Sequence, residues 1–117
     1  MLIKLYLNDG EDHFFGFRNK FANSPELTMV YSFEVSEWPG VRPDIQAALA
    51  WVFMEFNIGE GKFANEYRAK RLRSLSVGDV VTIGETAWAC ESVGWSAVSS
   101  TDLNNAIIWD DEKESVR

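Results

Sequence analysis

Two arginines and two serines lie close together in the middle of the chain, in the segment Arg71-Leu72-Arg73-Ser74-Leu75-Ser76. Guanidinium and hydroxyl groups are side chains that hold phosphate and carboxylate. One hypothesis is therefore an anion-binding corner made of Arg71, Arg73, Ser74 and Ser76. The alternative is structural, because the serines precede a Val77-Gly78-Asp79 turn and serine often bonds to loop backbone. We favour the structural interpretation, since most clusters of this composition are turns.

The same region is the most basic part of the chain. Five of the eleven basic residues fall in one short stretch: Lys62, Arg68, Lys70, Arg71 and Arg73. Such a stretch can hold nucleic acid when an aromatic ring, here Tyr67 or Phe63, stacks on a base. The alternative, which we favour, is a solvated face whose charges pair with the protein's own acids. The candidate binding residues are Tyr67, Arg68, Lys70, Arg71, Arg73, Ser74, Ser76 and, on a separate aromatic surface, Trp51.

Other residue types that do chemistry are sparse in this sequence. His13 is the single histidine, and the single cysteine, Cys90, is not spaced along the chain to share a metal with it. The acids are scattered, and Gly59-Glu60-Gly61 lacks the third glycine of a phosphate-binding loop. We therefore predict a protein that is not an enzyme and that uses neither a cofactor nor a metal.

Composition points to one folded domain spanning 117 residues, with an acidic, frayed tail from about residue 110. Hydrophobic residues make up 46% of the chain, which is enough for a core. The net charge of −7 argues against general attraction to nucleic acid or to an anionic membrane. With no apolar run long enough to span a membrane, no secretory signal pattern and a lone cysteine, we expect a cytoplasmic protein.

Several elements can be placed from local patterns. Alternation of apolar and polar residues predicts strands over Leu2–Leu7 and Leu27–Val35, paired antiparallel. A helix is predicted over Pro43–Phe56, with one apolar stripe made of Ile45, Ala48, Leu49, Val52, Phe53 and Phe56. If Phe53 lies in that stripe, its replacement by alanine should cost about 3–5 kcal/mol. Trp51 and Met54 fall off the stripe and could form a contact surface.

The second half of the chain reads as a small meander. Val80–Ile83 and Thr86–Cys90 are predicted to be strands joined by the two-residue turn Gly84-Glu85. Val93–Val98 is predicted to be a third strand, in which Gly94 marks a bulge or a close approach of another backbone. Trp88 and Trp95 should cover its core. A polar segment, residues 99–105, leads to a short edge strand or helical turn at residues 106–109. The predicted fold is α+β: a mostly antiparallel sheet of about five strands packed on one main amphipathic helix.

The nonapeptide Arg-Ser-Leu-Ser-Val-Gly-Asp-Val-Val at residues 73–81, followed by a hairpin and Val93-Gly94-Trp95, resembles the C-terminal part of small proteins from actinobacterial phages, plasmids and integrated elements. It is also similar to the tail of the YodL-like and KfrB-like domains. The resemblance covers about residues 45–98, where Phe56-Asn57 and Tyr67-Arg68-Ala69 share the spacing, and the nonapeptide is its specific part. It implies a mobile-element accessory protein and supplies no catalytic residues.

Three functional hypotheses follow. The leading one is a non-enzymatic interaction protein of a phage or mobile element that contacts a host or element-encoded protein, as an acidic mimic of DNA or as a counter-defence factor. The alternative is a small nucleic-acid-binding module that uses the basic patch from Lys62 to Arg73. The third is a homo-oligomer formed through Trp51, Met54 and other exposed aromatic residues.

Overall fold

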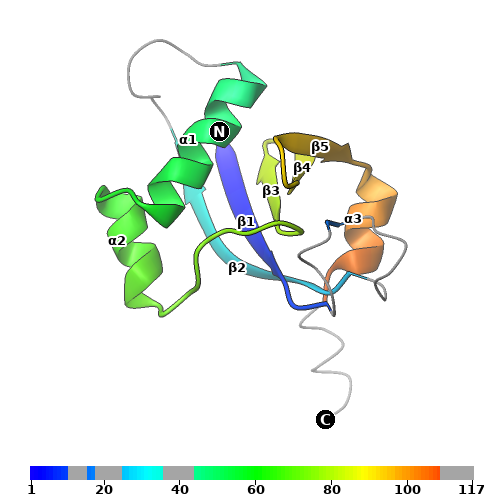
Figure 1. The fold of residues 1–117 in the computed structure, drawn as a ribbon, viewed down its shortest axis with the longest axis horizontal. Helices are drawn as coiled ribbons and strands as arrows, with labels where there is room; N and C mark the ends of the chain where they lie inside the picture. The colour runs from blue at the N-terminus through cyan, green and yellow to red at the C-terminus, as the bar shows by residue number, and fades with distance from the viewer. Residues whose placement is uncertain (11–15, 18–24, 36–43, 109–117) are drawn as a thin grey trace.

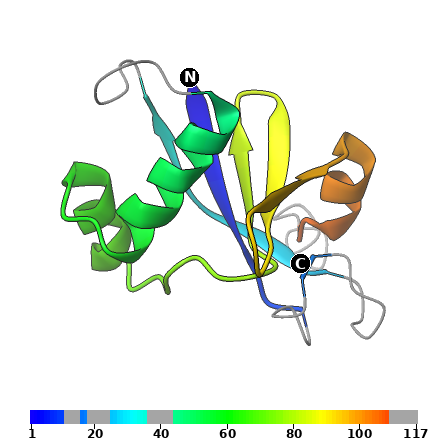
Figure 2. The ribbon, with the colours of Figure 1, turned by 45° about the horizontal axis from the view of Figure 1, so that its top comes forward.

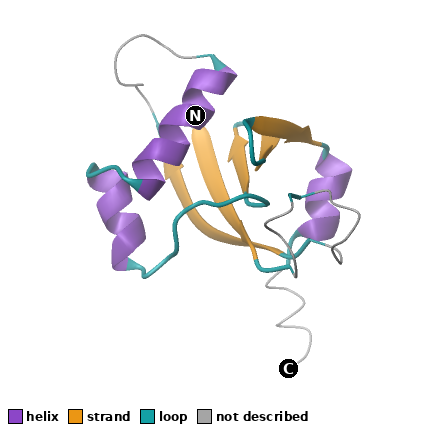
Figure 3. Ribbon diagram, in the orientation of Figure 1, coloured by secondary structure: helices purple, strands orange, loops and turns teal. Residues whose placement is uncertain are grey.

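The computed structural model describes residues 1–10, 16–17, 25–35 and 44–108, in which a pair of strands, a pair of helices, three strands and a last helix follow one another (Figure 1). The elements in these residues are β1 (Leu2–Asn8), β2 (Leu27–Glu34), α1 (Ile45–Asn57), α2 (Lys62–Ala69), β3 (Val80–Ile83), β4 (Thr86–Cys90), β5 (Trp95–Val98) and α3 (Ser100–Ala106). The five strands form one sheet in the order β2-β1-β3-β4-β5, and all neighbours are antiparallel. The predicted α+β fold is confirmed, as is the pairing of the first two strands (Figure 3).

β2 departs from the simple alternation that its sequence suggests. Its pairing with β1 shifts by one residue between Leu5 and Tyr6, which leaves Val30 as an extra residue in β2. A bulge of this kind changes the side of the sheet that the following residues face. Tyr31 accordingly lies in the core under α1, whereas Leu27 lies in the core on the opposite side. The prediction of one continuous apolar face along this strand is therefore wrong.

The hairpin between β3 and β4 has the predicted two-residue turn. Gly84 has a φ of +61°, while Glu85 is not among the residues with positive φ, which is the pattern of a type II′ turn with glycine first. The third strand of the meander begins at Trp95 rather than at Val93. Val93 and Gly94 lie in the loop before it, so the predicted bulge inside a strand is corrected to a turn that connects two strands.

α1 and α2 lie on one face of the sheet (Figure 2). Aromatic rings fill the space between the helices and the sheet: the ring of Phe33 is 5.3 Å from that of Phe56 and 4.5 Å from that of Phe63, between centroids. Trp88 and Trp95 pack half-buried against this core, as predicted. The core thus draws on strands and helices from both halves of the chain.

The buried side of α1 differs from the predicted stripe. Phe56 is 2% exposed, but Phe53 is 38% exposed and meets Trp95 edge-on, with ring centroids 6.2 Å apart. Val52 is fully buried at the centre of the contact with the sheet. The placement of Phe53 in the core is therefore wrong, because the residue that turns inward beside Val52 is the charged residue Glu55.

Glu55 is buried because it completes the next helix. Its carboxylate accepts a hydrogen bond of 3.3 Å from the backbone N–H of Ala64 in the first turn of α2. Gly61, the N-cap residue of α2, has no side chain to provide this bond. A Cβ at Gly61 would stand 2.5 Å from a Glu55 oxygen, so glycine leaves room for the carboxylate. α1 therefore caps α2, and the negative charge lies at the positive end of the α2 dipole.

α3 covers part of the opposite face of the sheet (Figure 1). The helix begins at Ser100, within the segment expected to be a polar connection, and the Ser99 hydroxyl accepts a 3.1 Å hydrogen bond from the Asp102 N–H. Ile107 then forms a parallel bridge with Leu27. The sheet is thus buried on both faces along β1 and β3. His13, Trp38, Trp109 and the predicted acidic tail lie outside the described residues.

Candidate functional site

The centre of the Arg-Ser-Leu-Ser-Val-Gly-Asp motif is an ion pair between its first and last residues. Asp79 is 0% exposed, and the Arg73 guanidinium approaches it with two nitrogens: Nη1 is 2.7 Å from Oδ2 and Nη2 is 2.8 Å from Oδ1. Such a bidentate pair is the strongest form of the arginine–carboxylate contact. Arg73 also donates to the backbone oxygens of Asn8, at 3.1 Å, and Ser74, at 3.0 Å.

Backbone groups supply the remaining partners of Asp79. The N–H of Asn8 lies 2.8 Å from Oδ1, and the N–H of Ser76 lies 2.7 Å from Oδ2. The Asn8 side chain in turn donates to the Gly78 oxygen at 3.0 Å and accepts from the Gly10 N–H at 2.8 Å. These contacts, which we call the Arg73–Asp79 network (Asn8, Arg73, Ser76 and Asp79), join the end of β1 to the loop that leads into β3.

The loop between α2 and β3 is also held from the helical side. The Asn57 amide brackets the backbone of Leu75, accepting from its N–H at 2.7 Å and donating to its oxygen at 3.2 Å. The Tyr67 hydroxyl donates to the Arg73 oxygen at 2.7 Å. Leu75 itself is buried in the core under α1. The hydrogen bonds of this loop therefore favour the structural interpretation of the motif over the anion-binding one.

The electrostatics of the network keep its donors protonated at neutral pH. Hydrogen bonds to Asp79 raise the pKa of Arg73, although its partial burial acts in the opposite direction. Burial raises the pKa of Tyr67 to about 12; the charge of Asp79 adds to this effect, while that of Arg73 lowers the pKa. Arg73 and Tyr67 therefore donate without change across the physiological range.

Two of the predicted binding residues are engaged inside the protein. Tyr67 is 1% exposed, and its ring packs edge-on against those of Tyr31 and Phe56 at 5.8 Å and 5.1 Å between centroids. A ring in this position is not available for stacking on a base. Arg73 keeps an exposed edge, but its hydrogen-bonding nitrogens are directed at Asp79 and at backbone oxygens.

The remaining predicted residues are only partly gathered. Arg68 near the end of α2, with Lys70 and Arg71 after it, are all exposed. Ser74 and Ser76 contribute backbone groups to the network described above. Trp51 on α1 and Lys62 at the start of α2 lie outside that network. Anion or nucleic-acid binding by Arg68, Lys70 and Arg71 stays a prediction.

Trp51 has a packing role that the sequence did not reveal. It lies half-buried on the flank of α1, with its ring centroid 6.3 Å from that of Phe33. It therefore belongs to the edge of the core under α1, on the β2 side, whereas Phe53 flanks the same helix near Trp95.

The outward side of α1 is an exposed surface that the predicted apolar stripe did not identify. Its exposed residues are Gln46, Ala47, Ala50, Phe53 and Met54, and Ile58 at its C-terminal end is 76% exposed. Glu55 is the one charged residue from Ile45 to Asn57, and it is buried. The sequence contained a signal of this uncharged surface, because the thirteen residues of α1 include a single charged one. We call this surface, from Gln46 to Ile58, the outer face of α1.

Cys90 is predicted to be an unreactive thiol. It is buried, and burial, with smaller effects from the charges of Asp79 and Glu91, raises its pKa from 9.0 to about 11. A difference of two units lowers the thiolate fraction about 100-fold at pH 8. Alkylation by iodoacetamide, followed by mass spectrometry, should therefore be at least about 100-fold slower in the native protein than in urea. Equal rates in the two states would show that Cys90 is accessible.

In the described residues, no group of three or more His, Cys, Asp and Glu side chains is placed to hold a metal ion. The helices of those same residues include none that is long and apolar enough to cross a membrane. Comparison with protein-family models, with curated proteins and with solved structures found no match to this chain.

Proposed function

We propose that this chain is a non-enzymatic interaction protein that binds another protein through the outer face of α1. The observation that carries the proposal is the absence of charge on that face. α1 exposes five residues without a charge among them, in a chain whose charged residues make up 25% of the total. A helix that is apolar on all sides is typical of one that is covered on all sides.

The exposed apolar groups are of the kinds that form contacts between proteins. Met54 and Phe53 lie next to one another on α1, and Phe53 reaches Trp95 on β5, so the apolar surface continues from the helix toward the sheet. Aromatic residues and methionine are enriched at protein interfaces, while acidic residues and lysine are depleted. Ala47 and Ala50 are small enough to allow close approach of a partner.

The charge of the chain indicates which partner fits this surface. A net charge of −7 attracts a basic protein at long range and repels a second copy of the same chain. We therefore propose a basic protein as the partner, with a host or element-encoded nucleic-acid-binding protein as the clearest example. Mimicry of DNA charge, a counter-defence role, a phage or mobile-element context and a cytoplasmic location extend the same proposal.

The nucleic-acid-binding alternative has less support. Of its two candidate stacking residues, Tyr67 is buried and Phe63 packs against Phe33 in the core. Arg73 is paired with Asp79. Of the predicted basic patch, Lys62, Arg68, Lys70 and Arg71 are left with exposed charges, beside the acidic residue Glu66. Four exposed cations on an acidic protein give a weak attraction to a phosphate backbone.

Site-specific photo-crosslinking tests the proposal. A benzoylphenylalanine placed at Met54 should cross-link a basic protein in a lysate of the host, whereas the same residue at Thr101 on α3 should not, because Thr101 is exposed on the other side of the sheet. The captured protein, once purified, should bind the wild-type chain. Met54→Glu should weaken that binding at least about tenfold, because it buries an unpaired charge in the interface.

Thr101→Glu is the matched control, since it adds the same charge at an exposed position and should change the affinity less than twofold, roughly the effect of a peripheral charge. Equal effects of the two substitutions would contradict a docking site on α1. Size-exclusion chromatography with light scattering distinguishes a basic partner from a second copy of the chain. A dimer that dissociates in the Met54→Glu variant would show that a second copy covers the helix.

A further inference from the structure

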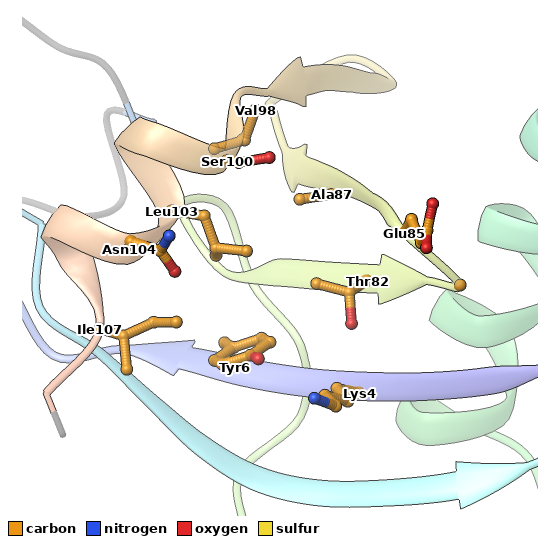
Figure 4. Close-up of a pocket in the computed structure, with 11 residues that line it drawn as sticks. Lys4, Tyr6, Thr82, Glu85, Ala87, Val98, Ser100, Leu103, Asn104 and Ile107 are labelled. Atoms are coloured by element: carbon orange, nitrogen blue, oxygen red, sulfur yellow. The ribbon is translucent and has the colours of Figure 1, made fainter. Parts of the chain in front are cut away.

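The face of the sheet that carries α3 also holds an open pocket of about 220 Å³ (Figure 4). Its floor is one row across the sheet, in which Lys4 is paired with Thr82, Thr82 with Ala87, and Ala87 with Val98. α3 forms one wall with Leu103. The pocket lies on the face of the sheet opposite to α1, so it is independent of the proposed docking surface.

Tyr6 provides the observation that points to a ligand. Its side chain lines the pocket and the residue is 6% exposed, yet its hydroxyl forms a hydrogen bond with none of the residues that the structure describes. Among the described residues, every side-chain oxygen that is fully shielded from solvent has a hydrogen-bond partner. Because the Tyr6 hydroxyl has none, it is not fully shielded and reaches the open space of the pocket. Burial raises the pKa of Tyr6, which keeps the hydroxyl a donor. A buried tyrosine normally has a partner for its hydroxyl.

Lys4 supplies a positive charge beside that hydroxyl. It lies two residues before Tyr6 on the same strand, and therefore on the same side of the sheet. The Lys4 ammonium forms no ion pair with any other described residue, including Glu85, which is exposed at the hairpin turn. An ammonium and an unbonded hydroxyl that line the same pocket from one side of a strand form an arrangement that recognises an oxyanion.

The rest of the lining divides into polar and apolar groups. Hydroxyl and amide groups come from Thr82, Ser100 and Asn104, and apolar surface comes from Ala87, Val98, Leu103 and Ile107. Glu85, at the hairpin turn, adds a carboxylate at the edge of the lining near Gly84. Figure 4 shows Leu103 and Asn104 on α3 directed toward the strands, with Tyr6 and Lys4 on β1. A volume of about 220 Å³ holds about seven water-sized groups at about 30 Å³ each.

We propose that this pocket binds a small organic oxyanion, a carboxylate or phosphate monoester that carries a short apolar chain. The Lys4 ammonium pairs with the oxyanion and the Tyr6 hydroxyl donates to it. The apolar chain lies against Val98 and Leu103. The apolar wall distinguishes such a ligand from inorganic phosphate, and the lysine distinguishes it from a neutral alcohol of equal length.

Titration by two-dimensional ¹H–¹⁵N NMR tests the proposal with four probes: sodium hexanoate, monohexyl phosphate, inorganic phosphate and 1-hexanol. Hexanoate or monohexyl phosphate should shift the amide signals of Tyr6, Thr82 and Leu103 in a saturable way, with a Kd of about 1–10 mM for so small a ligand. The tighter of the two identifies the headgroup. Binding of 1-hexanol as tight as that of hexanoate would overturn the proposal, and so would saturable binding of inorganic phosphate alone.

Two substitutions assign the contacts. Lys4→Met removes the charge but keeps the length of the side chain, and it should weaken binding about tenfold. Tyr6→Phe removes one oxygen and should weaken binding about fivefold. Both variants should fold, because neither polar group has a partner to lose in the described part of the protein. Lys62→Met, at an exposed position on α2, is the matched control. Equal affinity of the Lys4→Met variant and the wild type would overturn the proposal.

Discussion

Asp79→Ala is expected to destabilise the protein by about 3–5 kcal/mol, the cost of breaking a buried ion pair by removing one partner. Asp79 is 0% exposed and accepts four hydrogen bonds, two from Arg73 and one each from the N–H groups of Asn8 and Ser76. Arg73 can turn its exposed edge to water, but a backbone N–H that loses its buried acceptor costs about 1–3 kcal/mol. Most of the lost stability therefore comes from the backbone N–H groups of Asn8 and Ser76, which would have no acceptor.

Urea unfolding followed by tryptophan fluorescence measures this change as a shift in the free energy of unfolding. Glu60→Ala is the matched control, because it removes an exposed carboxylate and should change stability by no more than about 0.5 kcal/mol. A double-mutant cycle with Arg73→Ala isolates the pair itself. A loss below about 1 kcal/mol for Asp79→Ala would be that of an ordinary surface hydrogen bond, and the network would not be holding the loop.

Phe56→Ala should also cost about 3–5 kcal/mol, as expected when a buried aromatic residue leaves a cavity. Phe56 is 2% exposed, and its ring lies 5.7 Å, 5.3 Å and 5.1 Å from those of Tyr31, Phe33 and Tyr67, between centroids. The substitution removes the contact that joins α1 to both β2 and α2. The measurement is the same urea titration, with circular dichroism to verify that the variant is folded.

Phe53 provides an internal comparison within the same helix. Because Phe53 is 38% exposed and keeps one edge-on contact with Trp95, Phe53→Ala should cost only about 1 kcal/mol. The two substitutions delete the same atoms from positions three residues apart, so the difference reports which side of α1 faces the sheet. A loss for Phe53→Ala as large as that for Phe56→Ala would reverse the orientation of the helix described here.

Elements that depend on neighbouring residues were predictable from the sequence. Alternation in Leu2–Leu7 and the turn at Gly84-Glu85 specify strands and a hairpin because both follow from backbone conformations of adjacent residues. The amphipathic pattern of α1 likewise follows from the period of the helix. Among the candidate site residues, the turn at Asp79 is a local feature of this kind.

Features that depend on pairing between distant segments were not predictable. The bulge at Val30 exists because β2 must match β1 over its whole length, and the periodic pattern of β2 alone contains no trace of it. Glu55 reads as a solvated residue in sequence, but α2 places a helix N-terminus beside it. The partner of Arg73 was equally hidden, since every acid of the chain was an equivalent candidate before the loop was folded.

By itself, the sequence determined that this protein is an α+β domain with a hairpin after the Arg73 to Asp79 motif. Short-range sterics and hydrophobic periodicity depend on residues that are neighbours in the sequence, so they can be recognised without the fold. The tertiary structure decided which groups are free to act. Folding buries Tyr67 and pairs the charge of Arg73 with that of Asp79, and it leaves the outer face of α1 exposed. It also brings Lys4 and Tyr6 together with α3 around a pocket. Exposure and pairing are properties of the packed chain, because they depend on which distant segments exclude water from each side chain.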